Sequence, residues 1–149
     1  MKMLLCLLLL SPVGLIQAPA ADTERITYYV QLVRGNNETK SPDAASKPIG
    51  PKLSNELRRV FGWKSYWEVG RHQVEVHPSG TAKVKLSADR QVEIDLRVAG
   101  KRKVIAYSEG KPMSEITRPA GQKMTIIGGD RDKDSAWFIV VRRDKPTED

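Results

Sequence analysis

Three carboxylates recur at alternate positions in the segment DRDKDS, close to the C-terminal end of the chain. Asp130, Asp132 and Asp134 offer the oxygen ligands that calcium prefers, since this cation takes about six to eight of them. The segment departs from an EF-hand loop, because Ser135 stands where that loop needs a glycine. The two cations between the carboxylates also compete for them. The pattern therefore favours a charged hairpin tip, and a calcium site is the alternative; no other cofactor is indicated.

A second candidate is the stretch VFGWKSYWEV, which holds four of the nine aromatic residues (three Trp, four Tyr and two Phe). Aromatic rings beside a cation can stack bases, and each stacked base contributes about 1–3 kcal/mol. Tyr66 and Trp67 are adjacent in a predicted strand and point to opposite faces, so they cannot form one flat platform. We expect most of these rings to pack between a helix and a sheet. The candidate ligand-binding residues are Trp63, Lys64, Tyr66 and Trp67.

Short runs of basic residues indicate an anion-binding surface as a third candidate. The candidate residues are Arg58, Arg59, Lys101, Arg102 and Lys103, and the pair Arg142-Arg143 stands at the end of the last predicted strand. Cations gathered on one surface attract an anionic polymer at long range. These runs fall on a helix, a turn and a strand end, so the pattern favours ordinary solvation of separate surfaces, and the anion-binding surface is the alternative.

The sequence is poor in residues that carry out catalysis. His72 and His77 are the only histidines, and they lie on opposite faces of one predicted strand. The single cysteine, Cys6, falls in the apolar leader, and no serine stands in a G-x-S-x-G turn. The H-E-x-x-H, phosphate-loop and G-x-G-x-x-G motifs are all missing. This inventory favours a protein without a catalytic centre, and a small secreted hydrolase is the least favoured alternative.

Apolar periodicity predicts one helix, in the segment GPKLSNELRRVFGW. The stripe consists of Leu53, Leu57, Val60 and Phe61, which recur at i, i+4, i+7 and i+8. Pro51 suits the first turn of a helix, and Gly62 suits the left-handed residue that ends one.

The remaining segments predict strands joined by short turns. ITYYVQLVR, over Ile26–Arg34, is the first strand, and a flexible surface loop rich in proline and glycine is expected at 35–51. YWEV and QVEVH read as two further strands. The last strand contains six consecutive apolar residues, Ala136–Val141, so we expect it to be buried on both faces of a sheet.

Two neighbouring segments, TAKVKLSA and QVEIDLRV, alternate apolar and charged residues and predict a hairpin. Pairing around the turn would set Lys85 opposite Glu93 and Lys83 opposite Asp95, and such charge pairs help to fix the register. Val98 is expected to point inward with the other apolar residues of its strand. The predicted fold is mainly β (α+β), an antiparallel hairpin meander or sandwich of about seven to nine strands with one amphipathic helix.

The N-terminus, MKMLLCLLLLSPVGLIQAPAAD, has the layout of a secretory signal peptide. Lys2 precedes an apolar run far shorter than the roughly 20 residues of a membrane span. Small residues at Ala18-Pro19-Ala20 precede a cut. We expect cleavage near Ala20, which removes 1–20 and leaves no membrane span. The remaining 129 of 149 residues carry no cysteine and suffice for a single β-rich domain at 21–149.

The layout of the chain, from the leading strand through VFGWKSYWEV to the closing MTIIGGDRDKDSAWFIVVRRD, resembles that of small uncharacterised exported bacterial proteins. The resemblance is one of pattern and implies no activity for any residue. The net charge of +7 falls to +6 without Lys2. We therefore expect a non-enzymatic interaction or assembly module of the bacterial cell envelope, periplasmic or secreted, whose partner is an envelope protein. The alternative partner is an anionic polymer, either polysaccharide or nucleic acid.

The calcium hypothesis yields the first prediction. Titration of the protein with calcium should release no heat and should leave the melting temperature unchanged, because cations separate the three carboxylates of DRDKDS. Isothermal calorimetry and a thermal melt measure the two quantities. Saturable heat, abolished by Asp132→Asn, would establish a metal site instead.

Overall fold

The computed structural model describes residues 24–147, except for the side chain of Asp130. The predicted signal peptide lies outside the described residues. In chain order the elements are β1 (Ile26–Asn36), β2 (Lys47–Pro48), α1 (Pro51–Phe61), β3 (Ser65–Val76), β4 (Thr81–Lys85), β5 (Arg90–Asp95), β6 (Lys101–Ser108), β7 (Lys111–Pro119), β8 (Met124–Arg131) and β9 (Ser135–Arg142).

The strands form two antiparallel sheets, which confirms the prediction of a mainly β fold with one helix. Sheet A has five strands in the order β2-β3-β1-β9-β8, and sheet B has four in the order β4-β5-β6-β7. Sheet B is a meander of consecutive strands. In sheet A the first strand lies between β3 and β9, so the end of the described chain returns to its beginning.

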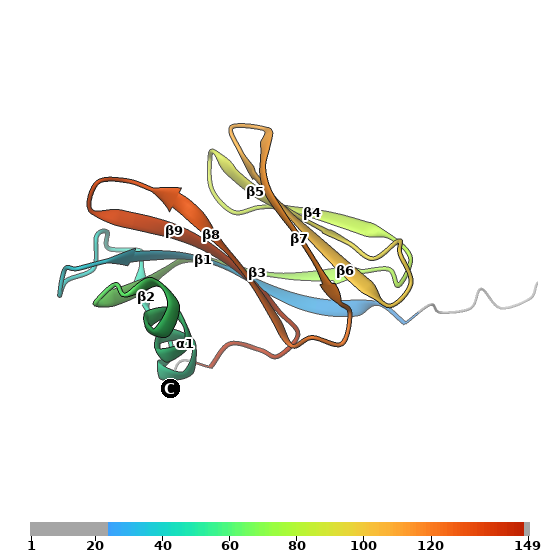
Figure 1. The fold of residues 1–149 in the computed structure, drawn as a ribbon, viewed down its shortest axis with the longest axis horizontal. Coiled ribbons are helices and arrows are strands. Elements are labelled where there is room, and N and C mark those ends of the chain that lie inside the picture. Colours follow the sequence, from blue (N-terminus) through green and yellow to red (C-terminus); the bar gives the residue numbers. More distant parts are fainter. Residues whose placement is uncertain (1–23, 148–149) are drawn as a thin grey trace, which may run out of the picture.

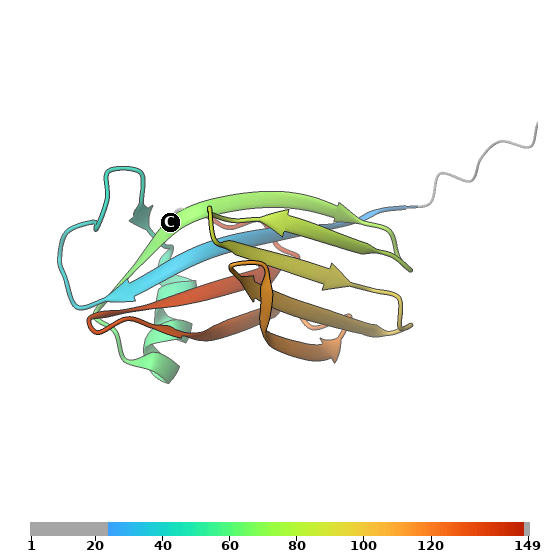
Figure 2. The ribbon, with the colours of Figure 1, turned by 90° about the horizontal axis from the view of Figure 1, so that it is seen from above.

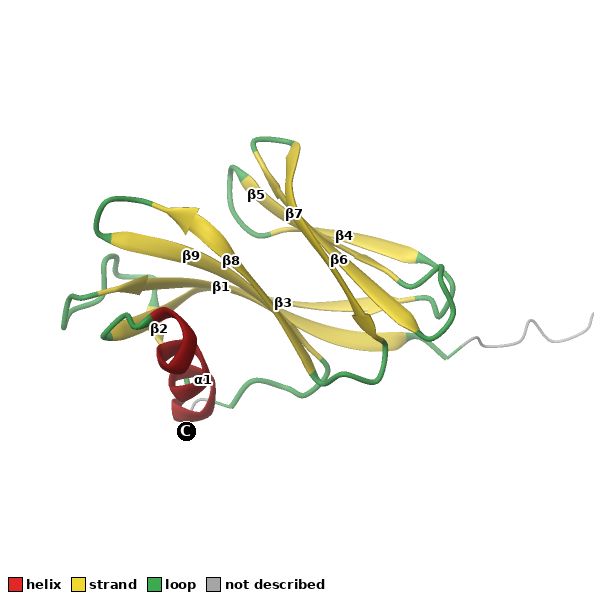
Figure 3. Ribbon diagram, in the orientation of Figure 1, coloured by secondary structure: helices red, strands yellow, loops and turns green. Residues whose placement is uncertain are grey.

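Sheet B and α1 cover opposite faces of sheet A, toward opposite ends of its long strands (Figure 1, Figure 2). Figure 3 shows the resulting three layers, with the single helix below one end of the sandwich. β1 has 11 residues and β3 has 12, so each strand is long enough to lie under sheet B at one end and over α1 at the other.

Each covering encloses its own apolar core. The core between the sheets includes Tyr28, Val30, Leu32, Val92, Ile94, Val104, Ile139 and Val141. The core under the helix contains Val33, Leu53, Leu57, Tyr66, Ala136, Phe138 and Val140. Because β9 alternates between the two cores, its unbroken apolar run is buried on both faces, as the sequence predicts.

The ring of Phe138 occupies a space that glycines on both neighbouring strands leave open. A Cβ on Gly128 of β8 would lie 2.8 Å from Cδ1 of this ring, and a Cβ on Gly35 of β1 would lie 3.1 Å from Cε2. Phe61 of α1 packs on the ring with centroids 4.6 Å apart, and Tyr66 meets it edge-on at 5.9 Å. This contact holds the last turn of α1 against sheet A.

The helix begins and ends where the sequence predicts. Gly62 adopts a left-handed conformation with φ of 73°, and its N–H donates to the carbonyl of Arg58. Val60 is an exception to the predicted apolar stripe, since it is 72% exposed, and Val98 is likewise 60% exposed because β5 ends before it. Among residues 24–147 there is no helix with the length and apolar character of a membrane span.

Two strands differ in extent from the prediction. β1 continues to Asn36, and Lys47–Pro48 forms a short strand, β2, that was not predicted, so the irregular segment is shorter than 35–51. Composition suggested a loop at Gly35, but this glycine lies in the strand, where the rings of Trp63, Tyr66 and Phe138 occupy the space of the missing side chain. YWEV and QVEVH form one continuous strand, β3.

The hairpin of β4 and β5 has a different register from the predicted one. Lys83, and not Lys85, lies opposite Glu93, so the prediction is wrong by two residues. The turn closes one residue earlier than predicted, because the N–H groups of Leu86 and Ser87 donate to the carbonyl of Arg90, and Ser87 also donates a 2.8 Å hydrogen bond to Asp89. Turn geometry sets the register here, and the charge pairs follow it.

The packing around Phe138 predicts that Gly128→Ala destabilises the fold. The added methyl overlaps the ring of Phe138 and the edge of Phe61, and such overpacking costs about 1–3 kcal/mol. Gly121→Ala is the matched control, because a Cβ there meets nothing within 4 Å. Urea unfolding of both variants measures the difference. Equal stability of the two variants would contradict the proposed packing.

Candidate functional site

The aromatic residues of VFGWKSYWEV do not share a surface. Tyr66 is 3% exposed in the core under the helix, where its hydroxyl accepts a hydrogen bond from the N–H of Trp63, and burial raises its pKa. Trp63 packs against the same core. Trp67 is buried on the opposite face of β3, and its indole donates to Asn36 at 3.0 Å. Lys64 is exposed.

The basic residues chosen from sequence are also separated. Arg58 and Arg59 lie in the last turn of α1. Lys101–Lys103, predicted as a turn, belongs to β6, so strand alternation places Lys101 and Lys103 on the outer face of sheet B and Arg102 on the inner face. Arg102 is therefore buried away from the surface on which Lys101 and Lys103 lie.

Arg102 is fully buried between the two sheets. Its Nη2 donates to the hydroxyl of Thr125 at 2.8 Å, and its guanidinium lies 5.3 Å from the centre of the Tyr28 ring. Nε and Nη1 have no hydrogen-bond partner among the described residues. An arginine in this position carries a desolvation cost that one hydroxyl and one ring offset only in part.

The carboxylates of DRDKDS lie at the hairpin between β8 and β9. Asp132 accepts a 3.4 Å hydrogen bond from Ser135 through Oδ2, and Asp134 is exposed. The side chain of Asp130 is outside the described part. Within the described residues no group of three or more His, Cys, Asp or Glu side chains could hold a metal ion. The calcium site remains the alternative that the calcium titration tests.

One serine and one histidine are in contact. The hydroxyl of Ser79 lies 3.2 Å from Nδ1 of His77, and the N–H of Ser79 is at the same distance from that nitrogen. Both residues belong to the turn between β3 and β4. The contact is explained by the turn alone, in which a side chain two residues away satisfies a backbone N–H.

A concave basic surface lies where the first turn of α1 meets β8 and the end of β9. Its inner part is a pocket of 160 Å³, here called the α1 pocket, lined by Lys52, Leu53, Glu56, Lys123, Met124, Arg142 and Asp144. Next to it is a wider depression of 510 Å³ that shares Lys52, Lys123 and Asp144 and adds Gly121 and Arg143. The helix brings no acidic residue in its first turn.

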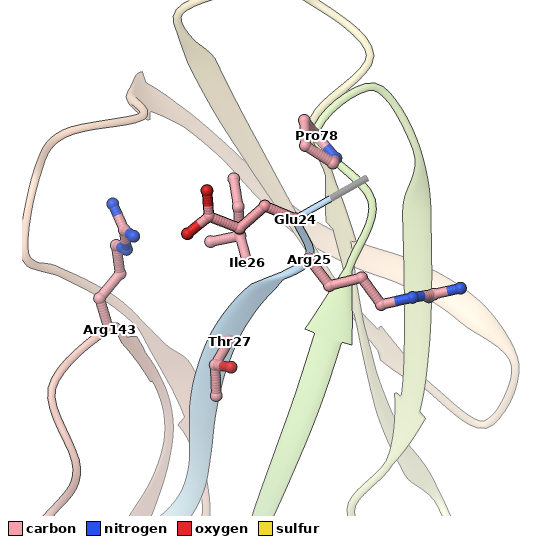
Figure 4. A pocket seen from close by; sticks show the side chains of 6 residues that line it. All are labelled: Glu24, Arg25, Ile26, Thr27, Pro78 and Arg143. Carbon is pink, nitrogen blue, oxygen red and sulfur yellow. The ribbon is translucent and has the colours of Figure 1, made fainter. Parts of the chain in front are cut away.

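Arg143 connects this surface with a third depression at the start of β1. That depression measures 600 Å³ and is lined by Glu24, Arg25, Ile26, Thr27, Pro78 and Arg143. Figure 4 shows the side chains of Glu24 and Arg143 directed toward each other across it, while Arg25 extends away. The three depressions together carry five cations and three carboxylates.

Arg142 is the buried cation of the α1 pocket. The residue is 8% exposed, its Nη2 donates to Asp144, and its Nε has no partner among the described residues. The hydrogen bond from Arg142 lowers the pKa of Asp144 below its usual value, and the charge of Lys52 acts in the same direction. Asp144 is therefore ionised at neutral pH.

Behind the α1 pocket is a void of 20 Å³ that the side chains of Gln31 and Arg142 both line. Oε1 of Gln31 and Nε of Arg142 are both buried without a hydrogen-bond partner in the described part of the chain. The void has room for about one water molecule. Glu68 fixes the amide of Gln31 through a 2.5 Å hydrogen bond.

The geometry of this surface suits the binding of an anion. A concave wall with converging cations focuses the positive potential, and a guanidinium held by its surroundings can make two parallel hydrogen bonds to a carboxylate or phosphate. Sequence reasoning noted Arg142-Arg143 as a basic pair but missed Lys52 and Lys123. Each of those is an isolated lysine far from the other in sequence, so no local signal marks them.

Comparison of the chain with family models, with curated proteins and with solved structures finds no match in any of the three.

The burial of Arg102 predicts that Arg102→Met stabilises the protein. Methionine fills similar space without a charge to desolvate, and replacing buried charges by apolar residues is neutral or stabilising by about 1–4 kcal/mol. Lys101→Met, on the exposed neighbour, should change stability by less than about 0.5 kcal/mol. Thermal and urea unfolding measure both variants. A loss of stability in Arg102→Met would contradict the prediction and show that the contacts with Thr125 and Tyr28 outweigh the desolvation cost.

Proposed function

We propose that the protein is an exported, non-enzymatic binding module of the bacterial cell envelope, and that its ligand is an anionic polymer. The observation that supports the polymer is the concave basic surface, whose neighbouring depressions share cations. The α1 pocket and the wider depression next to it share Lys52 and Lys123, and that wider depression shares Arg143 with the one at the start of β1. A linear polyanion can cross neighbouring depressions and contact several cations at once, and the gain in affinity grows with the number of contacts.

The signal-peptide layout of residues 1–20 supports the proposal that the protein is exported. The resemblance to small exported bacterial proteins supports the cell envelope as its location. A module without cysteine is compatible with an oxidising compartment, because its stability comes from its two apolar cores and needs no disulfide. The absence of catalytic motifs from the sequence supports binding in preference to hydrolysis.

The basic surface is distinguished from the other cationic faces by its shape. Lys101 and Lys103 also belong to an exposed face, but they lie on the outside of sheet B, where Lys103 is 3.9 Å from Glu115. Arg59 is paired with Glu56 on α1. None of Lys101, Lys103 and Arg59 lines one of the three depressions, and exposed ion pairs such as theirs contribute at most about 1 kcal/mol.

Charge reversal tests the proposal. The double variant Lys123→Glu/Arg143→Glu should elute from a polygalacturonate column at much lower salt than the unmodified protein. The slope of log affinity against log salt should fall by about two, because two cationic contacts are lost. Salt-gradient elution and titration at several salt concentrations measure both effects.

The control is Lys101→Glu/Lys103→Glu, which changes the net charge equally on the outer face of sheet B. It should elute close to the unmodified protein. An equal shift for both variants would show that net charge alone drives retention. If the unmodified protein is not retained at all, the proposed function is wrong.

A further inference from the structure

The α1 pocket differs from the open basic surface in having a fixed cation at its inner end. The side chain of Arg142 is only 10% exposed, whereas that of its partner Asp144 is 49% exposed. The guanidinium is held at the end of β9, but Asp144 follows the strand. Because the acid is half in water, exchanging it for another carboxylate costs little desolvation.

Asp144 thus occupies the position that an anionic group of a ligand would take. The chain that carries it continues to Pro146, which is buried and whose carbonyl accepts a 3.5 Å hydrogen bond from Arg71. This anchor holds the segment in place when the Asp144 carboxylate turns away. The exchange therefore needs a change of one side chain and no movement of a strand.

The lining and volume of the α1 pocket limit the size and chemistry of the group that can carry the ligand's carboxylate. Leu53 and Met124 provide apolar surface beside Arg142, with Lys52 and Lys123 as further cations. A volume of 160 Å³ corresponds to about five water molecules. That is enough for one six-membered ring with its substituents, whose C–H face can lie on the apolar wall.

The lining also argues against nucleobases. Single-stranded nucleic acids are held by aromatic side chains on which bases stack. None of the residues that line the three depressions is aromatic. The conspicuous rings, Trp63 and Tyr66, are packed in the core under the helix. The surface offers cations and a small apolar wall, and these features match an acidic sugar.

We infer that the α1 pocket binds one hexuronate unit of an acidic polysaccharide, whose carboxylate replaces Asp144 on Arg142. The inference rests on the proposed function, since it names the class of polymer and the subsite that selects it. Lys52 and Lys123 flank the bound carboxylate, and units on either side of it follow the wider depressions past Arg143.

The test compares two substitutions that each remove one carboxylate from the same pocket. In Asp144→Asn the competitor for Arg142 is lost, so trigalacturonate should bind about tenfold more tightly. In Glu56→Gln the same charge is lost, but Glu56 contacts Arg59 and not Arg142, so the gain should be at most about threefold. The charge of Asp144 is removed by substitution and not by lowering the pH, because acid would protonate the carboxylates of the ligand together with that of Asp144.

Arg142→Lys completes the experiment. It keeps the charge but loses the planar fork, so trigalacturonate should bind about tenfold more weakly, and Asp144→Asn should give no gain in this background. Thermal melts confirm that each variant is folded. Fully methyl-esterified trigalacturonate, which has the same body without the charge, should bind to none of the variants.

The outcomes separate the subsite from the wider proposal. Equal gains from Asp144→Asn and Glu56→Gln, or equal binding of the methyl ester, would overturn the subsite. Tighter binding of oligothymidylate than of trigalacturonate, with no effect of Asp144→Asn, would overturn it while leaving an anionic polymer as the ligand. Failure of the unmodified protein to bind any polyanion would remove the proposed function and the subsite together.

Discussion

The arrangement of the layers depends on the space that Gly35 and Gly128 leave for the ring of Phe138. A side chain on either glycine would meet that ring at about van der Waals overlap, and α1 could then not place Phe61 on it. A helix fixed by its last turn has its first turn beside the ends of β8 and β9, where Arg142 stands. The α1 pocket is therefore a consequence of packing at the opposite end of the helix.

Two buried arginines, Arg102 and Arg142, differ in whether an anion from solution can reach their guanidinium groups. Arg102 is enclosed between the sheets with Thr125 and Tyr28, and its charge is a burden on the stability of the core. Arg142 is nearly as buried, but it opens onto a pocket and shares a hydrogen bond with the half-exposed Asp144. The first environment is closed to an anion from solution, whereas the second presents a donor that another acid can reach.

Most features that depend on residues close together in the sequence were predicted correctly, and most features that depend on distant residues were not. Gly62 and the helical periodicity act within one or two turns, so the bounds of α1 were predictable. Gly35 was misread because its role depends on the rings of Trp63, Tyr66 and Phe138, which all lie far from it in the sequence. The register of β4 and β5 was misread because the turn closes on the carbonyl of Arg90, and turn geometry rather than the charge pattern fixes the pairing.

Local pattern was sufficient to establish a mainly β chain with one amphipathic helix, a last strand buried on both faces, and aromatic rings used in packing. It also marked Arg142 as part of a basic pair. The convergence of Lys52, Lys123 and Arg142 around one pocket required the folded molecule, as did the burial of Arg102. Periodicity reports which face of an element a side chain takes. It carries no information on which distant faces come to lie together, since that depends on how two cores and three layers pack.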